Sequence, residues 1–403
     1  MQNMDITMAD PNRRDKFQLP NGVIYLDGNS LGPLPIGVTE FVGDTMTQAW
    51  GKRLIKAWNA DDWITLSQRV GDKIARLIGA HPGTVRACDS TSVNLYKVLS
   101  AALAMKGNCG AILSDTGNFP TDLYVAQGLA SRLPDVTLRM VAPHDVYDAI
   151  NGDVAVVMLT QVDYRTGRKH DMHEITTLAH DVGALVIWDL AHSAGAFDVR
   201  LEAAQADFAV GCGYKYLNGG PGAPAFLYVA ERHLSALPNM VGWFGHAAPF
   251  AFETEFEPSQ SIDRFTVGTP PVLSMVALEA ALALWDDVDL RAVQERSTLL
   301  TDTFINSVSE FADAYELHLA TPRDPAMRGS HVSWHHPHAY PVMQALIDRG
   351  VIGDMRAPDF LRFGFAPLFN TVDEVREAAA VLHDILKTRY WDQPQFHARK
   401  AVT

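Results

Sequence analysis

The stretch that decides the fold is VAVVMLTQVDYRTGRKHDMHEITTLAHDVGALVIWD, residues 154–189. Its two ends, 154–160 and 184–189, are continuous apolar runs, and MHEITTLAHDVG (172–183) between them has helical spacing. Apolar strands that alternate with helices are typical of a mostly parallel sheet covered by helices on both sides. In such sheets the ligand lies beyond the carboxyl ends of the strands, so Thr160 and Asp189 are candidate site residues.

The same alternation extends on both sides of this stretch. Further strand-like runs are 111–115, 207–211 and 225–230, and TDLYVAQGLASRL (121–133) has one apolar helical face. Residues 36–80 are expected to be mainly helical after a loose entry segment, 1–20. GWFGHAAPFAFETEFEPSQ (242–260) lacks periodicity and predicts an extended loop, and 274–288 predicts a strong helix.

The C-terminal part predicts a second, smaller α/β unit. A long helix over 291–312 leads into it, followed by a strand (331–336), a helix (340–350), a strand (360–366), a helix (373–390) and a frayed end (391–403). The expected division is therefore an N-terminal segment over 1–50, a large domain over 51–290 and a small domain over 291–403.

Composition excludes several classes of function. The chain has 403 residues and a formal net charge of −14, which argues against nucleic acid or an anionic membrane as partner. It has no signal-like start and no apolar run of the roughly 18 residues that a membrane helix needs. The three scattered cysteines predict reduced thiols in a cytoplasmic protein. No metal is expected, even at HVSWHHPH (331–338), because neighbours on a strand point to opposite faces.

A lysine between two tyrosines is the sharpest chemical signal. It lies in GCGYKYLNGGPG (211–222), directly after an apolar run and before a glycine-rich turn. The glycines allow the tight backbone that a bulky cofactor requires, so Lys215 is a candidate site residue. Taken alone, the segment more often indicates a surface turn with a solvated lysine.

An aspartate at a strand end, with a histidine close behind it, is the second signal. In VIWDLAHSAGA (186–196), Asp189 ends the apolar run and His192 follows three residues later. A carboxylate there can pair with a protonated ring nitrogen and keep the ring charged, which makes the ring an electron sink. An aspartate that only caps the next helix is the alternative.

Two predicted helix starts carry weaker signals. Thr91 and Ser92 precede an apolar helical pattern, and hydroxyls with free N–H groups at a helix start make an anion site. Phe119 and Asp122 lie at a strand-to-helix junction, where an aromatic side chain could stack on a flat ring. The alternatives are a capping serine without a ligand, a core phenylalanine and an acid favoured by the helix dipole.

The order of these segments is more specific than any one of them. A phosphate-type helix start, an aromatic loop, an Asp-x-x-His strand end and a lysine 26 residues after the aspartate (189 to 215) resemble the fold-type I pyridoxal-phosphate enzymes. The class V aminotransferase-like branch is the most similar. The resemblance implies pyridoxal 5'-phosphate as cofactor, bound by Lys215 as a Schiff base, on an α/β fold with a large, mostly parallel sheet and a smaller C-terminal α/β domain.

Several segments, within a resemblance that covers about 20–375, are similar to the kynureninase family. They are YLDGNSLGPLP (25–35), FPTD (119–122), WDLAHSAGA (188–196), GYKYLNGGPGAPAF (213–226), GWFGH (242–246) and RFTVGTPPVLSM (264–275). The resemblance implies Lys215, Tyr214 and Asp189 as catalytic residues. The implied cofactor-binding set is Thr91, Ser92, Phe119, Pro120, Thr121, Asp122, Thr160, Asp189, His192, Tyr214 and Lys215, with Trp243 and Thr269 supplied by the second subunit of a homodimer.

The resemblance also implies a substrate and a reaction. Arg362 in FLRFGFAP resembles the arginine that grips the substrate carboxylate, and Asn29 and Ser30 complete the expected substrate-binding set. The implied reaction is hydrolysis of L-kynurenine, with its 3-hydroxy form also a candidate, to anthranilate and L-alanine in tryptophan degradation. Lys215 would act as base on the alpha proton, and Tyr214 would donate or relay a proton.

Three other functions compete with this expectation. A cysteine desulfurase or selenocysteine lyase needs a reactive thiol in the C-terminal part, yet the last cysteine is Cys212. A non-catalytic binding protein on the same fold should have lost Lys215 or Asp189. An aminotransferase would use both residues and stays open, although GWFGH and VGTPP favour the hydrolase.

Overall fold

The computed structural model describes residues 10–399. Residues 1–9 belong to the predicted loose entry segment and residues 400–403 to the predicted frayed C-terminus; both stretches lie outside the described residues. Within 10–399, no helix combines the length and the apolar character needed to cross a bilayer.

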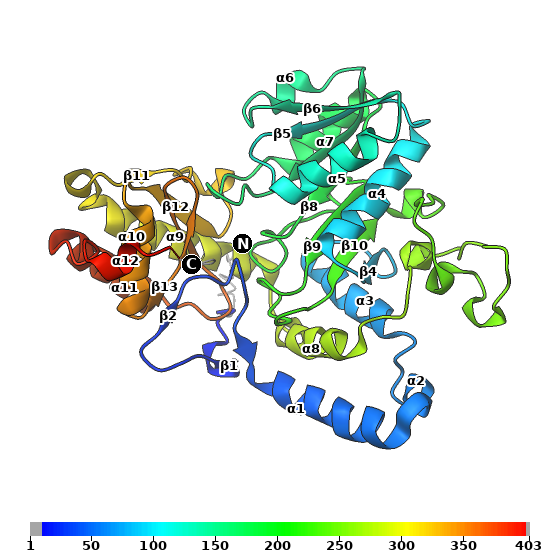
Figure 1. Cartoon of the computed structure of the whole chain (residues 1–403), viewed down its shortest axis with the longest axis horizontal. Coiled ribbons are helices and arrows are strands. Elements are labelled where there is room, and N and C mark those ends of the chain that lie inside the picture. Colours follow the sequence, from blue (N-terminus) through cyan, green and yellow to red (C-terminus); the bar gives the residue numbers. More distant parts are fainter. Residues whose placement is uncertain (1–9, 400–403) are drawn as a thin grey trace, which may run out of the picture.

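A seven-stranded sheet forms the centre of the larger part (Figure 1). Its strands, in spatial order, are β4 (Val85–Ala87), β10 (Ala225–Val229), β9 (Phe208–Cys212), β8 (Leu185–Asp189), β7 (Val154–Thr160), β5 (Gly110–Asp115) and β6 (Val136–Val141). Pairing is parallel from β9 to β6, whereas β10 is antiparallel to β9 and to β4. The mostly parallel sheet expected from the sequence is confirmed, and the short β4 and the half-exposed β6 are additions to it.

Helices bury both faces of this sheet, as the apolar runs predict. One core lies under α4 (Thr91–Met105) and α5 (Pro120–Ala130). The opposite core lies under α3 (Leu66–Ile78), α7 (Met172–Asp181) and α8 (Val272–Leu282), with the short α6 (Val146–Ala149) at its border. Neighbouring residues of one strand alternate between the cores: Val156 packs with α4 and Val157 with α7.

The N-terminal helical region is broken rather than continuous. It consists of α1 (Ile36–Asp44), the π-helix η2 (Thr45–Arg53), the 3-10 helix η3 (Leu54–Lys56) and α2 (Ala57–Ala60), and it runs as an arm below the sheet in Figure 1. The break falls at Leu54, which has a left-handed φ of 53°. Apolar side chains such as Ile36, Trp50 and Ile55 are exposed on this arm.

The C-terminal part has its own sheet and core. The strands β11 (His318–Leu319), β12 (His331–His335), β15 (Phe360–Gly364) and β14 (Asp354–Arg356) form an antiparallel sheet in that order. They pack on α9 (Leu290–Ser309), α10 (Ala339–Asp348), α11 (Val372–Lys387) and α12 (Pro394–His397). The predicted frayed end therefore contains a short helix, because Phe396 is buried in this core.

The N-terminal segment packs on the C-terminal part. Strand β2 (Ile24–Tyr25) pairs in parallel with β13 (Val351–Ile352), and β1 (Phe17–Gln18) pairs with β3 (Leu34–Pro35). The division at 50/51 and 290/291 stays our proposal, and the start of α9 at Leu290 supports its second boundary.

The remaining elements are short 3-10 helices. They are η1 (Arg14–Lys16), η4 (Glu231–His233), η5 (Trp243–Gly245), η6 (Pro249–Ala251), η7 (Ile262–Phe265), η8 (Ala283–Trp285), η9 (Ala312–Tyr315) and η10 (Pro325–Met327). The predicted loop over 242–260 contains η5 and η6 and is otherwise irregular.

Candidate active site

A cavity of about 650 Å³ opens at the carboxyl ends of the parallel strands, where the fold class places a ligand. Its lining includes most of the expected cofactor set: Thr91, Ser92, Phe119, Thr121, Asp122, Thr160, Asp189, His192, Tyr214, Lys215 and Thr269. The sequence reasoning missed other lining residues: Asp89, Ser90, Tyr164, Ala191, Gly222, Ala223, Pro224, Ala225 and Pro271. Most of these lie within two residues of expected site residues or between β9 and β10.

Lys215 reaches this cavity from the turn after β9. Gly220 and Gly222 have φ values of 81° and 77°, a region that side chains disfavour, and they let the chain reverse into β10. The Lys215 Nζ atom lies 3.1 Å from the Nε2 atom of His192. Burial, reinforced by the charge of Lys215, holds the pKa of His192 well below its usual range. The imidazole is therefore neutral near pH 7 and can accept a hydrogen bond from the ammonium group.

Two buried carboxyl groups share the floor of the cavity. Asp189 ends β8, and Asp122 lies in the first turn of α5; both side chains are almost inaccessible. Burial raises the pKa of each, and the charge of Asp189 raises that of Asp122 further. Lys215 and the Ala191 N–H, which donates to Asp189 Oδ1 at 2.7 Å, oppose the shift at Asp189. The pair thus favours a proton on Asp122 and a negative charge on Asp189.

A helix start also lines the cavity. Ser90 caps α4 by accepting a hydrogen bond from the Val93 N–H at 3.4 Å, and Thr91 and Ser92 form the first turn. The first N–H groups of a helix lack intrahelical acceptors and favour an anion. Thr91 Oγ1 also lies 3.5 Å from the Gly211 carbonyl oxygen, which joins this end to β9.

Aromatic side chains form one wall. Phe119 is 45% exposed, and its ring meets the ring of Tyr164 edge-on at 5.2 Å. Pro120 begins α5 between Phe119 and Thr121 but is not part of the cavity lining. Thr160, at the end of β7, donates its hydroxyl to the Val162 carbonyl at 3.3 Å.

Tyr214 lies beside Lys215 and keeps its proton firmly. Burial, with contributions from Cys212 and Asp189, raises the pKa of this phenol. The neighbouring Cys212 is buried, which raises the pKa of its thiol. The structure thus provides a neutral phenol that carries a proton near pH 7 but is a weak acid.

The expected substrate-binding residues lie outside this cavity lining, in a neighbouring cluster of charges. Arg362 is 1% exposed and donates from Nε to Asp354 Oδ1 at 2.7 Å and from Nη2 to Asp354 Oδ2. Its Nη2 also donates to Ser30 Oγ at 3.0 Å, and its Nη1 to the Tyr164 carbonyl. Through Tyr164, Arg362 is joined to the wall of the cavity.

Asp27 and Asn29 also belong to this cluster. Burial and the nearby Asp354 raise the pKa of Asp27 to about 7. Although burial opposes ionisation of Asp354, Arg362 and Arg356 hold its pKa below the usual range. Asn29 is also buried, and its side-chain amide finds no hydrogen-bond partner among residues 10–399.

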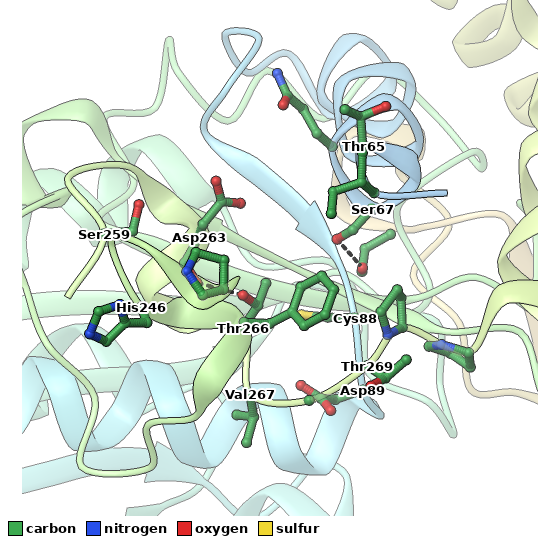
Figure 2. A pocket seen from close by; sticks show the side chains of 18 of the residues that line it. Thr65, Ser67, Cys88, Asp89, His246, Ser259, Asp263, Thr266, Val267 and Thr269 are labelled. Atoms are coloured by element: carbon green, nitrogen blue, oxygen red, sulfur yellow. Dashed lines mark hydrogen bonds between the residues drawn. The ribbon is translucent and has the colours of Figure 1, made fainter. Parts of the chain in front are cut away.

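Of the two residues that the second subunit of a homodimer is expected to supply, Thr269 lines the main cavity of its own chain and Trp243 does not. Thr269 lines the main cavity of its own chain and also a smaller one of about 280 Å³ (Figure 2). Trp243 lines neither; it is 39% exposed and packs against Phe244, Phe250 and Phe252. Over residues 10–399, no group of histidine, cysteine and acidic side chains is arranged to hold a metal ion.

Comparison with known sequences places the chain in one family. A family model described as the kynureninase C-terminal domain matches residues 293–382. The chain is 49% identical to a kynureninase of Pseudomonas fluorescens over 397 residues, which cover 97% of this chain and 95% of the relative. It is 52% identical to a kynureninase of Deinococcus radiodurans, with 93% and 92% covered.

Solved structures share the fold at low sequence identity. A cysteine desulfurase of Thermococcus onnurineus superposes with a TM-score of 0.77 at 22% identity, covering 93% of this chain and 97% of that one. A C-DES variant with glycine covalently linked to its pyridoxal-phosphate cofactor gives 0.79 at 17% identity, with 92% and 99% covered. These likenesses show the fold alone, and they confirm the expected fold-type I class. Sequence identity near 50% over almost the whole length shows more: the chain belongs to the kynureninase family.

Proposed function

We propose that this protein hydrolyses the bond between Cβ and Cγ of L-kynurenine, giving anthranilate and L-alanine, with pyridoxal 5'-phosphate bound at Lys215. The observation that carries the proposal is the meeting of Lys215, a buried acid pair and a helix start in one cavity. Membership of the kynureninase family supports the choice of reaction. The 3-hydroxy form of L-kynurenine is a second candidate substrate.

The residues of the cavity fit this cofactor at each end. Thr91, Ser92 and the first N–H groups of α4 would hold the phosphate, because a helix start favours an anion. Phe119 would lie against the flat ring. At the acid end, Asp122 Oδ2 is buried and receives no N–H donor from the described residues. The carboxyl pair therefore keeps one unsatisfied buried oxygen, and the negative charge on Asp189 suits a protonated ring nitrogen.

When bound, the cofactor supplies an electron sink for negative charge at the substrate Cα, provided that its ring nitrogen stays protonated. Asp189 supports that state because its pKa is restrained by Lys215 and by the Ala191 N–H. Asp122 holds its proton more firmly, because burial and the charge of Asp189 raise its pKa, and so leaves the negative charge of the pair on Asp189.

Proton movement at Cα is assigned to Lys215. With cofactor and substrate in place, the Lys215 Nζ atom would accept the alpha proton. His192 would keep Nζ oriented, since a neutral Nε2 atom 3.1 Å away accepts a hydrogen bond. Tyr214 would donate a proton to the developing products; its phenol carries that proton, and nearby positive charge or hydrogen bonding would have to offset its raised pKa for donation near pH 7.

Arg362 would hold the substrate carboxylate. Its Nε and Nη2 are engaged by Asp354, so the Nη1 edge, which meets the Tyr164 carbonyl, is the one that faces the cavity wall. Ser30 and Asn29 would support this end of the substrate; Ser30 already bonds Arg362, and Asn29 has unsatisfied buried polar atoms.

The assembly that we propose is a homodimer in which Trp243 and Thr269 complete the neighbouring site. Exposed apolar side chains beside Trp243, namely Phe250 and Phe252, support an interface there. A cytoplasmic location is supported by the free state of Cys88, Cys109 and Cys212.

A product assay tests the proposed activity. Purified protein loaded with pyridoxal phosphate should release fluorescent anthranilate and stoichiometric alanine from L-kynurenine. Formation of a 2-oxo acid without anthranilate would identify an aminotransferase instead. The Lys215→Ala variant, assayed in parallel, should form neither product.

A further inference from the structure

A fully buried lysine lies behind the helix start of the cavity. Lys97 is in the second turn of α4 and has no exposed surface. Burial of an ammonium group is costly unless the group is paired and hydrogen-bonded. The proposed reaction does not use this residue, so its partners should explain why it is there.

The Lys97 ammonium group has three hydrogen-bond acceptors. Its Nζ atom donates to Asp89 Oδ2 at 2.7 Å and to the Phe265 carbonyl oxygen at 2.7 Å, and it lies 3.5 Å from Cys88 Sγ. The three N–H donors of the ammonium are thereby satisfied. Its partners come from two separate segments, 88–89 and 265.

Residues 88–89 and the stretch directly after Phe265 both line the smaller cavity. Cys88 and Asp89 follow β4, and Thr266 to Thr269 follow η7; Figure 2 draws both groups around one space. Asp89 and Thr269 line the main cavity as well as the smaller one. Lys97 therefore bonds both to Asp89, which lines the two cavities, and to Phe265, which directly precedes the stretch 266–269.

Asp89 needs such a tie for two reasons. Its φ of 47° is left-handed, a conformation that costs free energy and persists where the surroundings impose it. Asp89, whose carboxylate binds Lys97, also lines the same cavity as Thr91 and Ser92. Without a compensating cation, that negative charge would repel an anion bound at the start of α4.

We propose that Lys97 is a positioning residue for the phosphate end of the cofactor site. By binding Asp89 and the Phe265 carbonyl, it fixes the turn before Ser90 and offsets the Asp89 charge, so that the start of α4 accepts a phosphate. This inference rests on the proposed function for the identity of the anion.

Equilibrium binding of two probes tests the inference. Apoprotein is titrated with pyridoxal phosphate and with pyridoxal, which lacks the phosphate, and binding is followed by absorbance. Lys97→Met should raise the Kd of pyridoxal phosphate about tenfold while that of pyridoxal changes less than about twofold. The matched control is Lys106→Met at the exposed end of the same helix, where the ammonium bonds the Gly183 carbonyl. This control should bind both probes as the wild type does.

An unchanged Kd for pyridoxal phosphate in Lys97→Met, or an equal loss for both probes, would overturn the inference. Should Lys97→Met fail to fold, the double variant Lys97→Met/Asp89→Asn removes the uncompensated carboxylate as well. Because the double variant still loses the tie between the turn before Ser90 and the Phe265 carbonyl, the inference requires it to lose affinity for pyridoxal phosphate but not for pyridoxal; wild-type affinity for both probes, or an equal loss for both, would overturn it. If the wild type itself binds no pyridoxal phosphate, the proposed function fails, an outcome distinct from a failure at Lys97.

Discussion

The lysine cavity and the arginine cluster lie next to each other but satisfy their charges in opposite ways. In the cavity, Asp122 and Asp189 face each other with raised pKa values, and Lys215 meets a neutral His192. In the cluster, Arg362 and Asp354 bind each other through two hydrogen bonds and hold the pKa of Asp354 low. The carboxyl pair of the cavity keeps an unsatisfied oxygen, whereas the Arg362–Asp354 pair is closed, even though Asn29 near it has unpaired polar atoms.

The difference assigns different tasks to the two regions. Buried groups with raised or lowered pKa values and unfilled hydrogen bonds indicate a place where a ligand supplies the missing partners. A closed ion pair indicates a fixed support, because removal of either member leaves a buried charge unpaired. We therefore expect changes in the cavity to act on activity and changes in the cluster to act on stability and substrate affinity.

The largest effect is expected for Lys215→Ala. Activity should fall by more than about 10³-fold, since the variant loses both the covalent anchor and the base at Cα. The visible absorbance of the lysine-bound cofactor should disappear as well, while the unfolding midpoint changes little. A retained visible band after dialysis would remove Lys215 from the role of anchor.

Asp354→Ala should show the opposite pattern. It leaves the buried Arg362 without its carboxylate, and loss of one member of a buried pair costs about 3–5 kcal/mol of stability. Urea unfolding measures this loss. As a control, Asp384→Ala breaks the half-exposed pair with Arg349 and should cost less than about 1 kcal/mol. Equal costs at the two positions would contradict the distinction between the regions.

Arg362→Lys tests the substrate side of the cluster. A lysine keeps the positive charge beside Asp354 but replaces the planar fork by a point charge. We expect KM for kynurenine to rise about tenfold with kcat little changed, which corresponds to about 1.4 kcal/mol of binding. Steady-state kinetics measures both constants, and an unchanged KM would exclude Arg362 from contact with the substrate.

The effect that is confined to acidic pH concerns His331, whose ring lies 5.3 Å from that of His192. Burial and the charge of Arg362 lower its pKa from 6.5 to about 3. Between these values the unfolded chain binds a proton that the folded chain does not, so stability should fall as pH falls through this window. The contribution is at most about 1.4 kcal/mol per pH unit.

His331→Phe removes this titrating group and should flatten the pH dependence of stability below neutrality. Unfolding free energies of variant and wild type, measured near neutral pH and about two units below it, give the two slopes. Parallel slopes would show that His331 does not stay neutral in the folded protein.

The main cavity could be predicted from the sequence because parallel strands bring their carboxyl ends to one edge. Thr160 and Asp189 end neighbouring strands in matched register. A polar residue at the end of an apolar run therefore indicated a position at the edge of the sheet where the ligand lies. Lys215 follows the next strand, β9. The glycines after it indicated the reversal that places its side chain at this edge.

Features that depend on contacts between distant segments were not predicted. Asp354 stands directly opposite Arg362 on paired strands, and only recognition of that hairpin would have indicated their ion pair. Lys97 lies among buried positions on a helix, yet its partner Phe265 is 168 residues away. Apolar periodicity likewise does not separate the π-helical turns of 45–53 from an α-helix, because their spacings are close.

Reduction of the cofactor-loaded protein with borohydride, followed by peptide mass spectrometry, tests the central claim most directly. The account predicts one stable phosphopyridoxyl adduct, on the peptide that contains Lys215, formed in the wild type and absent in Lys215→Ala. An adduct on any other lysine, or no adduct in protein that turns over kynurenine, would contradict it.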